Sequence, residues 1–144
     1  MPNRSRRELI KFSIGAIATL AVDPSLANAT PKEVDAAIGD WNSKGINAGV
    51  GNIRLIVPET VENGDRVPIE VNAPGALEIR IFADENQDPN VLAWKFGPAS
   101  GDQSVRTLIR LQGTQNVVAV AEYPDGSFER ATTRVKVETS GCRS

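Results

Sequence analysis

Residues 115–137 read QNVVAVAEYPDGSFERATTRVKV, and this stretch decides the expected fold. Residues 117–121 are continuously apolar, which is typical of a strand at the centre of a sheet. Asp125-Gly126 follows, a dipeptide that tolerates the positive φ of a tight turn. Residues 128–137 then form a second run of strand-forming residues. The stretch therefore predicts two neighbouring strands joined by a short turn.

Similar runs, separated by turn residues, precede this pair. We expect them to form strands at residues 53–57, 66–71, 77–83, 91–96 and 105–111. In the last of these, apolar residues alternate with Arg106 and Arg110, which is the pattern of a half-buried strand. Asn63-Gly64 is a second dipeptide that tolerates positive φ and marks a tight turn. About seven strands, with no helical pattern after residue 45, predict a mainly β fold, an immunoglobulin-like antiparallel β-sandwich.

One helix is expected before the strands. Residues 30–33, Thr-Pro-Lys-Glu, read as a capping box with proline at the first helical position. An apolar stripe at i, i+3, i+4, i+7 spacing follows, made of Val34, Ala37, Ile38 and Trp41. We expect this stripe, with Trp41 as its packing anchor, to lie against the sandwich, and Gly45 to end the helix.

The amino terminus predicts export. Residues 5–11, SRRELIK, resemble a twin-arginine signal, and the apolar run at residues 12–22 is too short to span a bilayer as a helix. Ala27-Asn28-Ala29 is a small-residue cleavage site. We therefore expect residues 1–29 to be a twin-arginine signal peptide and the mature protein to be periplasmic, without membrane attachment. A retained monotopic anchor is the alternative.

Charge and composition exclude several function classes. Without residues 1–29 the chain keeps 12 basic and 16 acidic residues, a net charge of −4, so nucleic acid is an unexpected partner. The chain has no histidine, which removes the usual general base and the commonest transition-metal ligand. One cysteine cannot by itself build a zinc or iron–sulfur site. These absences exclude most redox and hydrolytic mechanisms, and we expect no cofactor.

Two further motifs have ordinary structural explanations. Residues 84–90, DENQDPN, begin like a calcium loop, but Pro89 replaces the glycine of the sharp turn and Lys95 stands where a bidentate glutamate belongs. We interpret the segment as an acidic turn between two strands. Leu92, Trp94 and Phe96 share one strand face, and we expect them in the core, with a subunit interface as the alternative.

The single cysteine, Cys142, is the third residue from the carboxyl end and follows Gly141. A thiol beyond the last strand has little core to enter, so its reactivity is the better explanation for its presence. It either pairs with another molecule or acts as a free thiol. A thiol behind a glycine near a chain end can be threaded into a narrow site of another protein, which suits a covalent carrier.

The stretches PETVENGDRVPIEV (residues 58–71) and IRIFADENQDPNVLAWKFGPASGDQSVRTLIRLQGTQNVVAVAEYPDGSFERATTRVKVETSGC (residues 79–142) are similar to the SoxY family. SoxY proteins are the sulfur-carrying subunits of the periplasmic thiosulfate-oxidising Sox system. The most distinctive part is QNVVAVAEYPDGSF at residues 115–128, followed by a strand and a terminal cysteine. The resemblance covers most of the chain, apart from a variable helix and linker.

The resemblance implies a sandwich domain over residues 30–137 and a flexible arm over residues 138–144 that presents Cys142. It also implies pairing with a SoxZ-like subunit in a heterodimer. Thiosulfate would be joined to Cys142 by the haem protein SoxAX, and SoxB would release sulfate and leave a persulfide. Cys142 is then the covalent attachment residue for thiosulfate-derived sulfur, and the resemblance implies a substrate carrier that is not itself an enzyme. A non-carrier binding or assembly module whose Cys142 forms an intermolecular disulfide is the alternative.

The arm departs from the Gly-Gly-Cys-Gly-Gly pattern of the family, because residues 140–144 read Ser-Gly-Cys-Arg-Ser. Gly141 retains one flexible position beside the thiol. Arg143 brings a positive charge that favours the thiolate and attracts anionic thiosulfate. Its bulk opposes entry into a channel shaped for glycine. We therefore expect a divergent carrier with restricted handover between partner enzymes.

Overall fold

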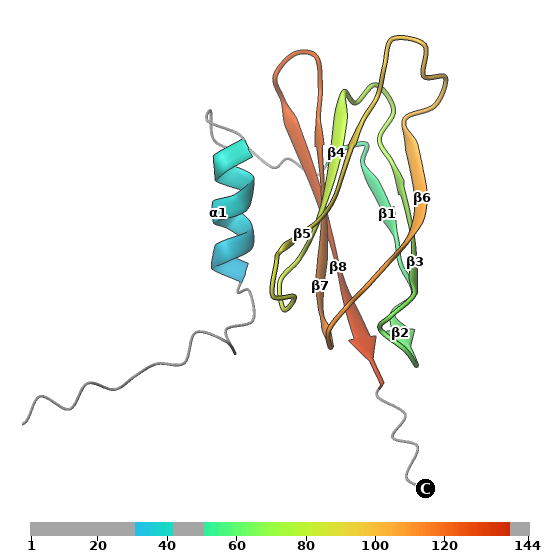
Figure 1. The fold of residues 1–144 in the computed structure, drawn as a ribbon. Helices are drawn as coiled ribbons and strands as arrows, with labels where there is room; N and C mark the ends of the chain where they lie inside the picture. Colours follow the sequence, from blue (N-terminus) through green and yellow to red (C-terminus); the bar gives the residue numbers. More distant parts are fainter. Residues whose placement is uncertain (1–30, 42–50, 139–144) are drawn as a thin grey trace, which may run out of the picture.

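The computed structural model describes residues 31–41 and 51–138. Within these residues one helix and eight strands form a sandwich of two sheets, and the helix lies on the outer side of the larger sheet (Figure 1). This helix is not long and apolar enough to cross a membrane. The elements are α1 (Pro31–Trp41), β1 (Arg54–Ile56), β2 (Thr60–Val61), β3 (Val67–Asn72), β4 (Glu78–Ala83), β5 (Asn90–Lys95), β6 (Ser104–Ile109), β7 (Gln115–Glu122) and β8 (Phe128–Val137).

The pair of strands predicted from residues 115–137 is the antiparallel hairpin of β7 and β8. Glu122 lies opposite Phe128 across the turn, and Gly126 in that turn has a φ of 78°. The larger sheet has the order β2-β8-β7-β4-β5, so β7 is at its centre, as its apolar sequence predicts. The seven predicted strands are all present, each within two residues of its expected bounds.

The eighth strand, β2, was not predicted, and it changes one feature of the expected topology. Thr60 lies opposite Lys136 and Val61 opposite Val137, and β2 runs parallel to β8. The predicted antiparallel β-sandwich is confirmed, and this one parallel pair is added at the edge of the larger sheet. Two residues are too few to produce a period-two pattern, so this strand depends on its partner for its existence.

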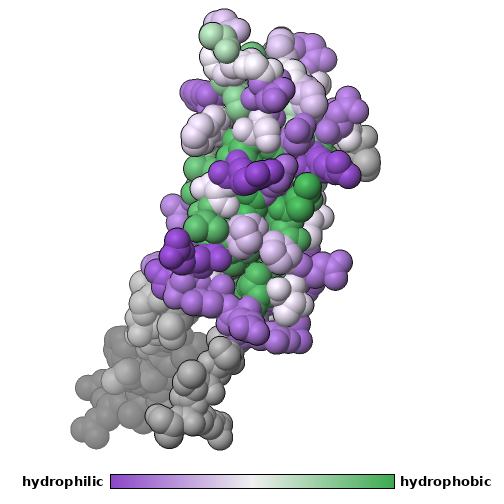
Figure 2. Space-filling view, turned by 90° about the vertical axis from the view of Figure 1, so that its right-hand side faces the viewer, coloured by the Kyte–Doolittle hydropathy of each residue, from purple (hydrophilic) through white to green (hydrophobic). Residues whose placement is uncertain are grey.

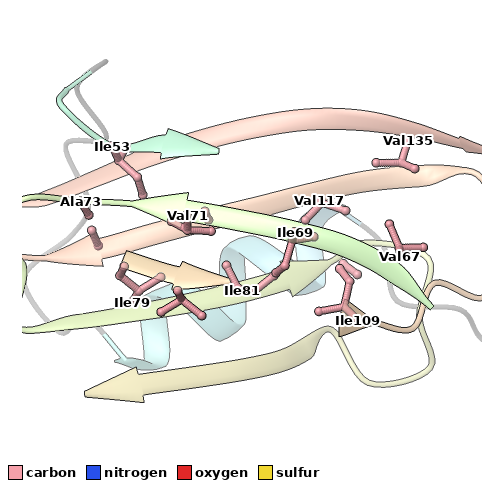
Figure 3. Close-up of a cluster of buried hydrophobic side chains, with 14 of the residues drawn as sticks. Ile53, Val67, Ile69, Val71, Ala73, Ile79, Ile81, Ile109, Val117 and Val135 are labelled. Carbon is pink, nitrogen blue, oxygen red and sulfur yellow. The ribbon is translucent and has the colours of Figure 1, made fainter. Parts of the chain in front are cut away.

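The core lies between the two sheets (Figure 3). The smaller sheet, of order β1-β3-β6, contributes Val67, Ile69 and Val71 from its central strand. Ile81 and Val117 face them from the larger sheet. These five side chains are at most 2% exposed, and burying each stabilises the fold by about 1.5–3 kcal/mol. The alternating residues of β3 therefore fix which side of that strand faces inward.

A second apolar cluster lies under the helix. Val34 and Ile38 of α1 pack with Phe82, Val118 and Val120 of the larger sheet, and all five are buried. The i, i+4 spacing of the helix residues places both on the face that meets the sheet. The predicted apolar stripe is confirmed.

The ends of this contact are held by ring and charge interactions. The ring of Trp41 meets that of Phe128 edge to face at 5.1 Å, and the guanidinium of Arg80 lies 4.3 Å from the centre of the indole. Arg130 of β8 donates to Asp35 of α1 at 2.8 Å. Trp41 is thus the packing anchor that the sequence predicts.

The first strand of the smaller sheet is tied to β8 through one carboxylate. Oε2 of Glu129 accepts the amide of Ile53 at 3.0 Å and the hydroxyl of Tyr123 at 2.6 Å. Burial and then this hydrogen bond raise the pKa of Tyr123 well above its usual range. The three groups fix the start of β1 against the larger sheet.

The prediction that Leu92, Trp94 and Phe96 all enter the core is correct only in part. Leu92 and Phe96 pack partly against the core, but the side chain of Trp94 is 50% exposed. The reason is that β5 is an edge strand of a five-stranded sheet, which is wider than the three-stranded sheet facing it. An inward-facing residue at such an edge has no opposite sheet to meet.

Candidate functional site at the root of the carboxyl-terminal arm

The predicted site residues Gly141, Cys142 and Arg143 lie outside the described residues, which end at Glu138. Cys142 follows four residues later. An extended chain spans at most about 3.3–3.6 Å per residue, so Cys142 lies within about 14 Å of Glu138. The position of Glu138 therefore bounds where the thiol can act, and we call residues 136–138 and their contacts the arm root.

One side of the arm root is held by β2. The amide of Lys136 donates to the carbonyl of Glu59 and the amide of Glu138 donates to the carbonyl of Val61, both at 2.8 Å. The two donating amides are two residues apart, so the backbone pairing continues to Glu138, the last described residue. The short parallel strand thus keeps the end of β8 within the sheet.

The other side of the arm root is held by a single hydroxyl. The strand β7 begins at Gln115, opposite Val135, so no backbone of β7 pairs with Val137. The hydroxyl of Thr114 instead accepts the amide of Val137 at 3.0 Å and donates to its carbonyl at 3.4 Å. The side chain of Thr114 therefore continues the hydrogen bonding between β7 and β8 by one further position, where β7 itself has ended.

A glycine supports the same end of the molecule. The amide of Leu111 donates to the carbonyl of Gly64 at 2.7 Å, and a Cβ at residue 64 would lie 2.1 Å from the carbonyl oxygen of Leu111. The turn predicted at Asn63-Gly64 is present. Gly64 does not have the positive φ that the dipeptide would tolerate, since positive φ occurs in the described residues only at Gly75 and Gly126. A glycine is needed at residue 64 because any side chain would collide with the carbonyl of Leu111.

The loops around the arm root are tied by amide and carboxylate side chains. Asp84, which is 4% exposed, accepts the backbone amide of Asn116 at 2.8 Å and its side-chain amide at 2.6 Å. The buried Gln115 donates to the side-chain oxygen of Asn86 at 3.0 Å. The segment 84–90 therefore acts as the predicted acidic turn between β4 and β5. Its oxygens bind protein donors, and no cluster of three metal-ligating residues occurs in the described part of the chain.

Charge at the arm root comes from both signs. Nζ of Lys136 lies 2.9 Å from Oε1 of Glu138, and this hydrogen bond lowers the pKa of Glu138 and raises that of Lys136. Arg134 is exposed and makes no ion pair with any described carboxylate. A groove of about 670 Å³ runs beside them and is also lined by Glu59, Thr60 and Thr114. Cations and hydroxyls at such a groove are donors suited to an oxyanion, while Glu59 opposes one.

Sequence reasoning missed Thr60, Val61 and Thr114 as parts of this site. A two-residue strand and a threonine in a turn have no local pattern that distinguishes them. The usable signal was the length of the strand predicted at residues 128–137. Its backbone N–H and C=O groups need hydrogen-bond partners along the whole strand, including the end that β7 does not reach.

The chain matches a protein-family model and several solved structures. The family model described as "Sulfur oxidation protein SoxY" matches residues 40–142, so the match ends at Cys142. A solved structure of the sulfur carrier protein SoxY from Chlorobium limicola f thiosulfatophilum is 31% identical. Its TM-score is 0.63, and the alignment covers 74% of this chain and 96% of that one.

More distant solved structures share the fold alone. Superoxide reductase (neelaredoxin) from Ignicoccus hospitalis is 18% identical with a TM-score of 0.54, over 76% of this chain and 93% of that one. A second structure of it is 17% identical with a TM-score of 0.55, over 77% and 95%. No curated protein matches the chain.

Proposed function

The chain belongs to the SoxY family, and we propose that Cys142 is the residue on which it carries sulfur. The family gives the broad role, that of a sulfur carrier of the Sox system. The observation that carries the finer assignment is that the family match extends to Cys142 and that this is the only cysteine of the chain. No other thiol is present to take the role.

The chemistry needs only a thiolate from this chain. The thiolate of Cys142 and thiosulfate together lose a pair of electrons and form a sulfur–sulfur bond, which gives a cysteine S-thiosulfonate. In the scheme that the family resemblance implies, the haem protein SoxAX takes these electrons. Hydrolysis by SoxB then adds water to the terminal sulfonate, releases sulfate and leaves a persulfide on Cys142. The chain itself acts as covalent carrier, not as catalyst.

The arm root supports this role mechanically. The backbone amides of Lys136 and Glu138 donate to the carbonyls of Glu59 and Val61, and the hydroxyl of Thr114 accepts the amide of Val137, so the chain is held up to Glu138. The tether to the thiol is then only four residues long, which keeps the carried group at a high effective concentration near a docked enzyme. Arg143 next to the thiol favours the thiolate and restricts entry into narrow channels.

The test is the intact mass of the mature protein purified from its own host during growth on thiosulfate, before and after reduction. We expect mass increments of a thiosulfonate or of added sulfur on wild-type protein, removed by reductant, and none on Cys142→Ser. A bare thiol, or a disulfide dimer as the only modified form, would contradict the carrier role and favour a binding module.

A second experiment tests restricted handover. A Sox system without its own carrier is supplied with this protein or with a Ser140→Gly, Arg143→Gly variant. We expect thiosulfate oxidation to be faster with the variant, because glycines flanking the thiol restore backbone freedom and a narrow profile. Full turnover by the native arm would contradict the restriction.

Export to the periplasm by the twin-arginine route belongs to the same proposal. It is supported by the SRRELIK segment and by the family, whose pathway is periplasmic. Replacing Arg6 and Arg7 by lysine should retain the uncleaved precursor in the cytoplasm, whereas cleaved periplasmic protein from this variant would contradict the route.

A further inference from the structure

The outer sides of the two sheets differ in polarity. The outer side of the three-stranded sheet faces the viewer in Figure 2, where apolar residues show between polar ones. On the larger sheet, α1 covers Phe128 of β8 and bonds Arg130. Beyond Arg130 the same side of β8 carries Thr132, Arg134 and Lys136, because side chains two residues apart share one side of a strand. All three are exposed, so the end of β8 presents polar and charged groups to solvent.

Arg134 is the unpaired cation on this side of β8. Arg130 before it is paired with Asp35 at 2.8 Å, and Lys136 after it is paired with Glu138 at 2.9 Å. Arg134 makes no ion pair with a carboxylate of residues 31–41 or 51–138. A guanidinium offers five N–H donors in a planar fork that matches the oxygens of an oxyanion. This side chain is therefore available to an external anion.

The groove beside Arg134 supplies further donors. Its volume is about 670 Å³, and Thr60, Thr133 and Lys136 also line it. Thr60 lies directly opposite Lys136 in the parallel pair of β2 and β8, so their side chains share one side of the sheet. The hydroxyls of Thr60 and Thr133 make no hydrogen bond with another described residue, and each can donate one to an oxyanion. We call this groove the arm-root groove.

One carboxylate of the arm-root groove opposes an anion. Glu59 lines the groove, is exposed and pairs with no cation of the described chain. An anion in contact with Arg134 gains charge-assisted hydrogen bonds, whereas an exposed carboxylate repels it through water and is screened by salt. We therefore expect an anion to bind weakly, in the millimolar range, and Glu59 to reduce its affinity.

The arm-root groove lies within reach of the thiol. Glu138 is four residues from Cys142 in one direction and four residues from Arg134 in the other. Each stretch spans at most about 14 Å when extended. An arm that turns back along β8 can therefore bring Cys142 beside the groove.

We propose that the arm-root groove is a non-covalent binding site for a tetrahedral sulfur oxyanion, with Arg134 as its principal donor. Two sources share this chemistry, which are free thiosulfate or sulfate and the sulfonate end of a group carried on Cys142. Binding in the groove needs no thiol and forms no covalent bond, so the site goes beyond the carrier role. Free thiosulfate held here is close to the thiol that it joins, which raises its local concentration.

The test is an NMR titration of the mature Cys142→Ser protein with sodium thiosulfate, with sodium chloride at equal ionic strength as the reference. This variant excludes covalent attachment. We expect saturable shifts of the backbone amides of Thr60, Arg134 and Lys136 that chloride does not produce. Arg134→Gln in the same background should weaken binding about two- to fivefold, the range of one exposed ion pair.

Two further variants test the sign and the location of the effect. Glu59→Gln removes the opposing carboxylate and should tighten binding about twofold. Arg54→Gln is the matched control for Arg134→Gln. Arg54 is also exposed and without an ion pair in the described chain, but it lies on β1 of the smaller sheet. Its replacement changes the net charge by the same amount and should leave the affinity unchanged.

A loaded protein distinguishes the two sources. The thiolate of wild-type Cys142 attacks a central sulfur of tetrathionate, which forms the sulfur–sulfur bond of a cysteine S-thiosulfonate and releases thiosulfate. The released thiosulfate is removed by dialysis. If the carried sulfonate occupies the groove, the shifted amide of Arg134 appears without added anion and is lost in Arg134→Gln. If the groove takes only the free anion, the shift appears on titration alone.

Three outcomes would overturn the inference. The first is that neither thiosulfate nor the loaded group shifts these amides more than chloride does. The second is unchanged affinity in Arg134→Gln. The third is equal weakening by Arg54→Gln, which would show a response to net charge alone. None of these affects the mass increments on Cys142, so failure of the arm-root groove and failure of the carrier role are distinguishable.

Discussion

The two outer sides of the sandwich carry apolar residues in similar alternation but differ in what covers them. On the larger sheet, Phe82 and Val120 are buried beneath Val34 and Ile38 of the chain's own helix. On the smaller sheet, Leu108 and its neighbours remain half exposed. The first side contributes to the stability of the monomer, whereas the second contributes little to it. Apolar alternation along a strand therefore shows only that one of its sides carries apolar residues. Whether a helix of the same chain packs on that side depends on the rest of the structure.

The largest expected effect breaks the covered side. Phe82→Ala removes a fully buried ring between helix and sheet, and we expect the free energy of unfolding to fall by about 3–5 kcal/mol. Urea denaturation followed by circular dichroism measures it. A loss below about 1 kcal/mol would mean that the helix does not seal this side as described.

The next effect concerns the arm root, where hydrogen bonds replace apolar cover. Thr114→Val removes both hydrogen bonds to Val137 and should destabilise the end of β8 by about 1 kcal/mol. The amide of Val137 should then exchange with solvent several-fold faster by NMR. Thr114→Ser keeps the hydroxyl and should restore slow exchange. Equal exchange in the valine and wild-type proteins would show that the hydroxyl does not hold the arm root.

A smaller effect is expected on the outer side of the three-stranded sheet. Leu108→Ser removes a half-exposed side chain, and we expect the free energy of unfolding to change by less than about 0.5 kcal/mol. The contrast with Phe82→Ala, measured in the same urea series, sharpens the comparison of the two sides. A loss comparable to that of Phe82→Ala would show that Leu108 supports the monomer.

The smallest expected effect concerns the exposed ion pair between Lys136 and Glu138 at the end of β8. The hydrogen bond from Lys136 lowers the pKa of Glu138, so the pair stabilises the folded state above the unfolded pKa of this glutamate and is lost as the pH falls through its folded pKa. Lys136→Gln should return the pKa of Glu138 towards its ordinary value in an NMR titration, with little change in stability. Arg134→Gln, which removes a charge not paired with Glu138, should leave that pKa unchanged.

The candidate site was predictable only in part. The thiol of Cys142 can be chosen from the sequence because it is the only cysteine. Gly141 and Arg143 follow from the resemblance to the arm of the family, and the roles of all three residues stay predictions. The residues that hold the arm root could not be chosen in this way. Glu59 and Val61 meet β8 from a segment far away in the sequence, and Thr114 acts through one side chain in a turn. Such contacts between distant segments leave no hydrophobic periodicity in the sequence from which they could be predicted.

What the sequence by itself determined is the sandwich, its seven longer strands and the stripe of the helix, because alternation and i, i+4 spacing are properties of neighbouring residues. The tertiary structure alone decided that β2 pairs in parallel with β8, that Gly64 is required by the carbonyl of Leu111, and that Trp94 lies at an open edge. It also decided that the helix covers one sheet and leaves Ile56 and Leu108 exposed on the other. These features depend on which distant segments meet, and burial is a property of that meeting rather than of any local pattern.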